Sequence, residues 1–227
     1  MVKQFYRQGL TEKMIERPVV LYCNKMKHTK ERILTRGLDL LARDGFAGIT
    51  LGVLAEQAGV SKSGLFAHFG SKEELQLCLL EKMTQVGAST FVAPAMLQPQ
   101  GLPRLKAAFK GWLGWTQKAG LHGGCPVAAG MFELDDADLN DPLRQRLLAM
   151  EERWRGFLMQ LTGEAIETGD LKGDLEVDQF VWELCGIYLN HHVSYRFIQD
   201  PLANERAMTA FTALVDRSSK RQLRRRS

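Results

Sequence analysis

The most constraining feature of the sequence is a pair of short predicted helices joined by a glycine turn, within residues 49–75. The Thr50 hydroxyl can cap the first helix, and Gly59 follows it where a tight turn needs a residue that tolerates positive φ. Ser61 can cap the second helix, Lys62 to Phe69. Two helices joined in this way cross steeply, so the second can enter a DNA major groove about 12 Å wide.

Two further helices flank this predicted helix-turn-helix. One starts near Thr29, because apolar residues recur at helical spacing until Asp44-Gly45 stops them. The other is capped by Ser71 and carries two glutamates in its first turn, where carboxylates suit the positive end of the helix dipole. The face of the motif that should pack inward consists of Leu54, Ala55, Val60, Leu65 and Phe69.

The outward face of the second helix carries small and polar residues that suit contact with DNA. Small side chains allow a close approach to base edges, and the flanking hydroxyl, lysine and histidine groups can donate to phosphate oxygens. The predicted DNA-binding residues are Thr50, Ser61, Lys62, Ser63, Gly64, Ala67, His68 and Lys72. The alternative interpretation is a helical hairpin within an ordinary bundle.

Residues 30–80 resemble the DNA-binding domain of the TetR (tetracycline-repressor) family. The resemblance rests on Gly45-Phe46, Ile49-Thr50, Leu54-Ala55, Ala58-Gly59-Val60-Ser61-Lys62, Leu65-Phe66, His68-Phe69 and Ser71-Lys72-Glu73-Glu74-Leu75. Two positions depart from the family pattern. Phe66 replaces a tyrosine that commonly contacts a phosphate, so we assign it no phosphate role, and Val53 replaces the usual acidic capping partner of Thr50.

The resemblance implies an all-α fold, with an N-terminal three-helix helix-turn-helix domain and a C-terminal helical ligand-binding and dimerisation domain. It implies a transcriptional repressor that binds a palindromic double-stranded DNA operator as a homodimer and is released by a small-molecule effector. The segment GGCP and the acidic stretch after it resemble one subgroup of the family's ligand domains. The identity of the effector, the operator sequence and the regulated genes do not follow from the resemblance.

The remainder of the chain is expected to be helical, with no sheet, because no run of alternating β-branched residues occurs. The predicted helices are Leu102–Lys118, Pro126 to about Leu134, Pro142–Thr168, Leu175–Ile198 and Asn204 to about Ser218. The predicted divisions are a basic arm (1–28), the DNA-binding domain (29–75), the ligand-binding and dimerisation domain (76–218) and a basic tail (219–227).

Aromatic and methionine side chains in the C-terminal half predict an apolar ligand pocket, although such residues also fill ordinary cores. The predicted pocket residues are Trp112, Trp115, His122, Met131, Phe132, Trp154 and His191. Cys125 stands at a predicted helix N-terminus, where the dipole lowers a thiol pKa. It is either a redox-sensing thiol or a small buried residue.

The last two helices are predicted to form the dimer interface, because two helices from each subunit can build a four-helix bundle around a two-fold axis. The predicted interface residues are Leu184, Ile187, Tyr188, His191, Tyr195, Phe211 and Leu214. The alternative is that these faces cover only the core of their own subunit.

Composition narrows the function further. The net charge of +4 is uneven, with basic residues concentrated at both ends of the chain, so a polyanion would be met there or nearby. The four cysteines form no CxxC pair, and no nucleophile–base pair or metal-ligand spacing occurs. We therefore expect no enzyme, catalytic residue, cofactor or metal site, with a helical enzyme and a helical adaptor as the rival classes.

We also expect a cytoplasmic protein without a membrane partner. No run of about 18 apolar residues is present, and the basic N-terminus lacks the apolar core of a secretory signal. Residues 1–25 are predicted to be dispensable for folding and for operator choice. Either translation starts near Met26, or these residues form a basic extension that adds non-specific phosphate contacts.

Overall fold

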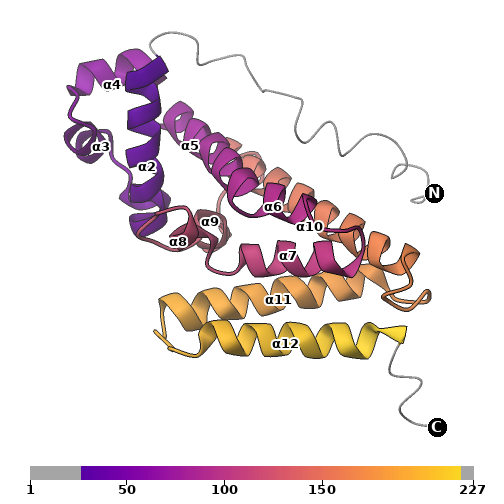
Figure 1. Ribbon diagram of the computed structural model, residues 1–227. Helices are drawn as coiled ribbons and strands as arrows, with labels where there is room; N and C mark the ends of the chain where they lie inside the picture. Colours follow the sequence, from indigo (N-terminus) through magenta and orange to yellow (C-terminus); the bar gives the residue numbers. More distant parts are fainter. Residues whose placement is uncertain (1–26, 221–227) are drawn as a thin grey trace.

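The computed structural model describes residues 27–220, and these are almost entirely helical (Figure 1). The elements are α2 (Lys27–Gly48), α3 (Leu51–Ala58), α4 (Lys62–Phe69), α5 (Lys72–Gly87), the π-helical turn η1 (Ala88–Val92), α6 (Ala93–Met96), α7 (Leu102–Trp112), α8 (Trp115–Lys118), α9 (Pro126–Glu133), α10 (Pro142–Glu167), α11 (Val177–Arg196) and α12 (Ala203–Ser218). Within this range the β structure is a single bridge between Leu171 and Ser219. The all-α prediction is confirmed.

The helices fall into two regions (Figure 1). Helices α2, α3 and α4 gather at one end, and α5 leads away from them toward η1 and α6. Helices α11 and α12 lie side by side along the opposite edge, beneath α7. The proposals for residues 1–25 and for most of the basic tail lie outside the described residues, while Lys27 and His28, assigned to the arm, belong to α2. No helix in residues 27–220 is long and apolar enough to cross a membrane.

The caps of the helix-turn-helix form as the sequence predicts. The Thr50 hydroxyl oxygen accepts from the Val53 amide at 3.2 Å, and Ser61 and Ser71 cap α4 and α5 in the same way at 3.0 Å. Gly59 adopts the left-handed conformation, with φ 63°, that the turn between α3 and α4 requires. Val53 is exposed and leaves the α3 cap one-sided, as expected.

The inward face of the motif packs on α2 and α5. Leu54, Ala55, Leu65 and Phe69 are buried and Val60 is partly buried, which confirms the predicted face. Their contacts come from apolar residues of α2 and α5, among them Ile33, Leu38, Leu41, Leu75 and Leu79. Burial on this scale is the main source of stability for helices as short as these.

The predicted helix Leu102–Lys118 is wrong in one respect, because it breaks after Trp112. Leu113 is extended and Gly114 has φ 64°, a left-handed conformation that glycine adopts without steric cost. The Lys118 ammonium group then donates to the carbonyls of Lys110 and Leu113, both at 2.7 Å. These hydrogen bonds supply donors to carbonyl groups that have no partner within α7 at its C-terminal end. Periodicity continues through such a break, so the apolar pattern alone did not reveal it.

The predicted dimer interface is wrong for most of its residues. Leu184, Tyr188, His191, Phe211 and Leu214 are each 5% exposed or less within one subunit. Phe211 stacks on Phe109 of α7, with ring centroids 4.2 Å apart, and the His191 ring bonds Asn204 at 2.8 Å. The apolar faces of α11 and α12 therefore cover the core of their own subunit, and only Ile187 and Tyr195 are part-exposed.

Candidate DNA-binding surface and ligand cavity

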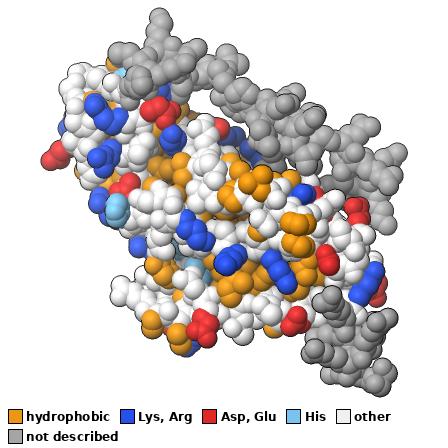
Figure 2. Space-filling view, viewed as in Figure 1, with side chains coloured by type: hydrophobic (Ala, Val, Ile, Leu, Met, Phe, Trp, Pro, Cys, Tyr) orange, Lys and Arg blue, Asp and Glu red, His pale blue; other side chains and the backbone are white. Residues whose placement is uncertain are grey.

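Helix α4 presents a polar, accessible surface next to its N-terminus. Ser61, Lys62, Ser63 and Ala67 are exposed, and Gly64 and His68 are partly exposed. Thr50 and Lys72 are exposed at the starts of α3 and α5. Figure 2 shows Lys and Arg side chains over the α3–α4 end of the molecule. The eight predicted DNA-binding residues are thus all accessible to a large partner.

The capping hydroxyls remain available to a phosphate. A serine or threonine oxygen that accepts an amide hydrogen can still donate its own hydrogen. Thr50 therefore caps α3 and keeps its donor for DNA. The Ser61 hydroxyl caps α4 and shares a 3.1 Å hydrogen bond with the Ser63 hydroxyl, so one of these two hydroxyls keeps a donor for DNA. Phe66, to which we assigned no phosphate role, has a ring that is 47% exposed on α4. An apolar ring there suits contact with a thymine methyl group rather than with a phosphate.

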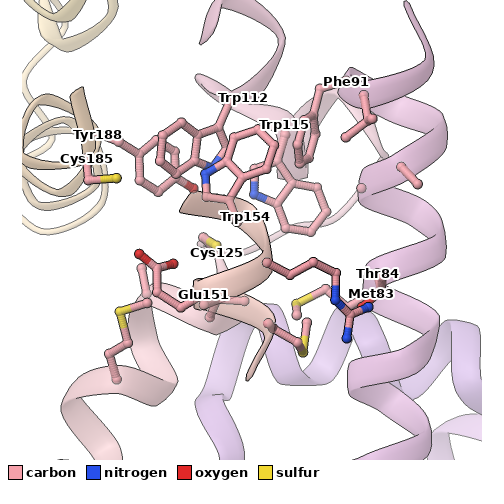
Figure 3. A pocket seen from close by; sticks show the side chains of 18 of the residues that line it. Met83, Thr84, Phe91, Trp112, Trp115, Cys125, Glu151, Trp154, Cys185 and Tyr188 are labelled. Atoms are coloured by element: carbon pink, nitrogen blue, oxygen red, sulfur yellow. The ribbon is translucent and has the colours of Figure 1, made fainter. Parts of the chain in front are cut away.

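A cavity of about 140 Å³ lies between the helices of the C-terminal region (Figure 3). Residues of α5, η1, α7, α8, α9, α10 and α11 line it. Four of the seven predicted pocket residues are among them, namely Trp112, Trp115, Met131 and Trp154. Sequence reasoning missed Phe91, which lies on the π-helical turn, and assigned Tyr188 to the dimer interface instead.

The aromatic residues of the cavity form one packed group (Figure 3). Trp112 stacks on Tyr188, with centroids 3.7 Å apart and planes 8° apart. Trp154 meets Trp112 and Phe91 edge to face, at 4.8 and 5.2 Å. The edge-to-face contacts of Trp154 are a favoured arrangement of aromatic rings. The cavity wall is therefore built largely from ring faces and ring edges.

The polar groups of the cavity are largely satisfied by their neighbours. Glu151 accepts from Arg155 Nε at 2.8 Å. Burial raises the pKa of Tyr188 well above its ordinary value, and Cys125 and Trp115 are the polar neighbours of its hydroxyl. Burial, reinforced by the charge of Glu151, raises the pKa of Cys185 to about 11, so this thiol is protonated at neutral pH. The Trp154 indole N–H is buried without a partner.

Three predicted pocket residues lie elsewhere. Phe132 is 63% exposed, because it follows Met131 by about 100° around α9 and so points away from the cavity. His122 is exposed and bonds Asp39 of α2, while His191 is held by Asn204. Cys125 occupies the N-cap position of α9, lines the cavity and is 7% exposed. This burial favours the small buried residue over the redox thiol.

Helix α9 and the turn before it join the cavity to the DNA-binding helices. Val127, Ala128 and Met131 of α9 line the cavity. At the far end of the same helix, one Glu133 oxygen accepts from the amides of Phe46 and Ala47, at 2.9 and 3.0 Å. These amides lack helical partners because α2 is interrupted at Gly45, where φ is 71°.

The turn before α9 also rests on α2. The Gly124 amide donates to the Ala42 carbonyl at 2.8 Å, and the His122 amide donates to Asp39 at 2.8 Å. Gly123 lies so close that a Cβ there would sit 1.9 Å from the Ala42 oxygen. The glycines of the GGCP segment therefore serve a close backbone approach between the two regions.

Two family models match the chain. "Bacterial regulatory proteins, tetR family" matches residues 33–77, and "Tetracyclin repressor-like, C-terminal domain" matches residues 101–211. The chain belongs to the TetR family. Both matches fall on the regions described above, the helix-turn-helix and the helices that surround the cavity.

Individual relatives agree with this assignment. An uncharacterised HTH-type transcriptional regulator of Lactococcus lactis is 23% identical over 141 residues, which are 61% of this chain and 72% of that protein. The regulator RutR of Escherichia coli is 40% identical over 57 residues, 25% of this chain and 27% of RutR. A TetR regulator structure from Chloroflexus aurantiacus superposes with a TM-score of 0.72 at 22% identity, covering 84% of this chain and 93% of that one.

Membership of the TetR family makes the protein a DNA-binding transcriptional regulator and not an enzyme. The likeness to the Chloroflexus structure shows the fold.

Proposed function

We propose that this regulator is a ligand-responsive repressor that binds a palindromic operator as a homodimer and leaves it when a small molecule fills the cavity. The observation that carries the proposal is the position of α9. One side of α9 lines the cavity, and its end and the preceding turn hold α2 by hydrogen bonds. A change of cavity shape is thereby passed to α2, the helix on which α3 packs, and α3 in turn contacts α4.

In this proposal α4 enters the major groove. Lys62, Ser63, Gly64, Ala67 and His68 face the bases and the adjoining backbone, and Phe66 packs on a thymine methyl group. The phosphate donors at the edges are Thr50, Ser61 and Lys72. Two α4 helices of a dimer would enter successive major grooves, with half-site centres roughly 34–36 Å apart.

The dimer that we propose uses the outward sides of α11 and α12, not their buried sides. Trp182, Gly186, Val193 and Phe197 are exposed and recur at helical spacing on one face of α11. Three are large apolar residues, and Phe197 is 87% exposed. The exposed side of α12 carries small residues in its middle (Thr209, Ala210, Thr212 and Ala213), which allow close helix contact, and charged residues toward its ends. The corresponding faces of two subunits would form a four-helix bundle.

The domain division that we propose keeps residues 29–75 as the DNA-binding domain and 76–218 as the ligand-binding and dimerisation domain. The boundary falls inside α5, which is continuous from Lys72 to Gly87. Its first turn follows α4 directly, and Met83, Thr84 and Gly87 line the cavity at its other end. Helix α5 is therefore a second connection between cavity and DNA.

Ligand and DNA should then oppose one another. If the ligand favours a conformer whose α4 helices are wrongly spaced for the operator, DNA must weaken ligand binding by the same factor. The polar groups His122 and His191 have no part in this proposal, because neither lines the cavity.

The test is binding to DNA from upstream of the protein's own gene, measured by gel shift and fluorescence anisotropy across a salt series. Lys62→Ala and Lys72→Ala should each weaken binding, and each lost phosphate contact should flatten the log–log salt slope by about 0.9. Lys106→Ala, an exposed lysine of α7, is the control and should bind normally. Unchanged binding in both test variants would refute the docking model, and no DNA binding at all would favour a helical adaptor.

A further inference from the structure

We infer that the cavity takes a compact, uncharged aromatic molecule of one ring or two small fused rings. This inference rests on the proposed function in one respect, that the cavity is the effector site. Its size, its wall and its charge lead to the same class of ligand.

The size of the cavity limits the ligand. At about 140 Å³ it resembles an engineered apolar cavity of about 150 Å³ in another protein, which stays dry and binds benzene. A steroid or a long acyl chain needs several times that volume, and small-molecule sites for such ligands are about 300–1,000 Å³. A molecule with one or two small rings fits with little rearrangement of the wall.

The wall favours an aromatic ring over an aliphatic chain. Phe91, Trp112, Trp115, Trp154 and Tyr188 surround the space with ring edges and faces (Figure 3). A flat ring can add to this network by edge-to-face contact. Three methionines, Met83, Met131 and Met150, complete the wall, and their flexible thioethers adapt to a ring and contact it favourably.

The charged residues of the cavity wall offer no free partner to a cationic or an anionic ligand. The residues that line it include two charged side chains, Glu151 and Arg153. Glu151 is paired with Arg155, so a cation would find no free carboxylate within the wall. Arg153 is exposed and stays hydrated at the rim, so an anion inside would find no buried cationic partner. An ion without a partner loses its hydration and is excluded.

The test uses the full-length protein and five small probes in titration calorimetry. Phenol and indole should bind once per chain. Cyclohexanol matches phenol without the aromatic ring, and benzoate and benzyltrimethylammonium carry opposite charges on a ring. Each of these three should bind about tenfold more weakly or worse than phenol. Equal binding of any of the three, or no binding of phenol and indole, would overturn the inference.

Two blocking variants locate the bound probe. Val127→Phe on α9 and Val92→Phe on η1 each add volume at a partly buried cavity position and should abolish phenol binding. Leu148→Phe is the control, because Leu148 is 48% exposed on α10 and lies outside the cavity wall. Phenol binding that persists in both blocking variants would contradict the site.

A second readout needs no variant. Three tryptophans line the cavity, so phenol should change tryptophan emission in the wild-type protein, and calorimetric binding without that change would place the probe elsewhere. The effector role is measured separately, by operator release at saturating phenol. Binding without release would leave the ligand class standing and refute the proposed function. Operator binding together with rejection of all neutral rings would refute the ligand class alone.

Discussion

The contact between the GGCP turn and α2 can be tested by adding one methyl group, in Gly123→Ala. A Cβ at this position would lie 1.9 Å from the Ala42 carbonyl oxygen and 2.4 Å from the Arg43 nitrogen. Both are backbone atoms of α2, so neither can turn aside as a flexible side chain would. The variant can fold only if the turn lifts away from α2, which breaks the 2.8 Å hydrogen bond from the Gly124 amide to Ala42.

The expected loss of stability follows from these contacts. Overpacking costs about 1–3 kcal/mol, and the lost hydrogen bond costs about 1 kcal/mol. Alanine restricts the unfolded chain more than glycine does, and this effect alone raises the free energy of unfolding by about 0.4–1 kcal/mol. The free energy of unfolding should therefore fall by about 2 kcal/mol. For a protein of this size the melting temperature should fall by about 4–8 °C.

The measurement is thermal and urea unfolding followed by circular dichroism. Gly163→Ala is the matched control, because Gly163 lies inside α10 and a Cβ there would meet nothing within 4 Å. That variant should be more stable than the wild type by about 0.5–1 kcal/mol, the usual gain from replacing a helical glycine. Equal melting of Gly123→Ala and the wild type would show that the turn does not rest on α2.

Three further predictions concern the interface, the connection to α2 and the pH dependence. Phe197→Glu should yield folded monomers in sedimentation, because this ring is exposed within the subunit. Leu184→Glu should instead unfold the chain, because it buries a charge. If the Phe197→Glu protein remained dimeric, the interface would lie elsewhere. The Glu133→Ala protein should bind the operator but release it less readily when a cavity ligand is added in anisotropy titrations. The reason is that the Phe46 and Ala47 amides lose their acceptor, which connects α9 to α2. An unchanged response would exclude Glu133 as the connection. Burial lowers the pKa of His191 and His192 below 6.5, so the folded state favours their neutral forms. The free energy of unfolding that depends on these neutral forms is fully present above pH 6.5, and it is lost as the pH falls through the lowered pKa values. His191→Gln should flatten that fall in chemical unfolding, and an equally steep fall would assign it to other groups.

The helix-turn-helix could be predicted almost residue by residue, because its signals are local. The hydroxyls of Thr50, Ser61 and Ser71 each cap the helix that follows, and Gly59 makes the turn. A cap needs only its own first turn, and a turn needs only its own φ angle. The break at Gly114 is the exception, since it is completed by Lys118, whose ammonium group reaches back to α7.

The cavity and the interface could be predicted only in part, because they depend on which helices meet. Periodicity correctly marked Leu184 and Tyr188 on the apolar face of α11 and Phe211 on that of α12. A pattern does not say whether such a face is covered by the same subunit or by another. Single rings were equally ambiguous: Met131 and Phe132 are neighbours in sequence, yet one lines the cavity and the other is exposed. The link through Glu133 pairs residues 87 positions apart, and no local signal indicates it.

The two connections between cavity and DNA-binding helices give the proposed response a direction. Helix α5 joins the cavity to α4 along one continuous helix, and α9 joins it to α2 through Glu133 and the Gly124 amide. Packed interiors deform little, so a ligand that widens the cavity must displace one of these helices rather than compress its neighbours. Because α3 and α4 pack on α2 and α5, the DNA-binding helices would move together, relative to the α11–α12 face on which the proposed dimer is built. A small shift at the cavity would then change the spacing between the two α4 helices of a dimer. Operator affinity depends on this spacing, because the half-sites on the DNA lie a fixed distance apart.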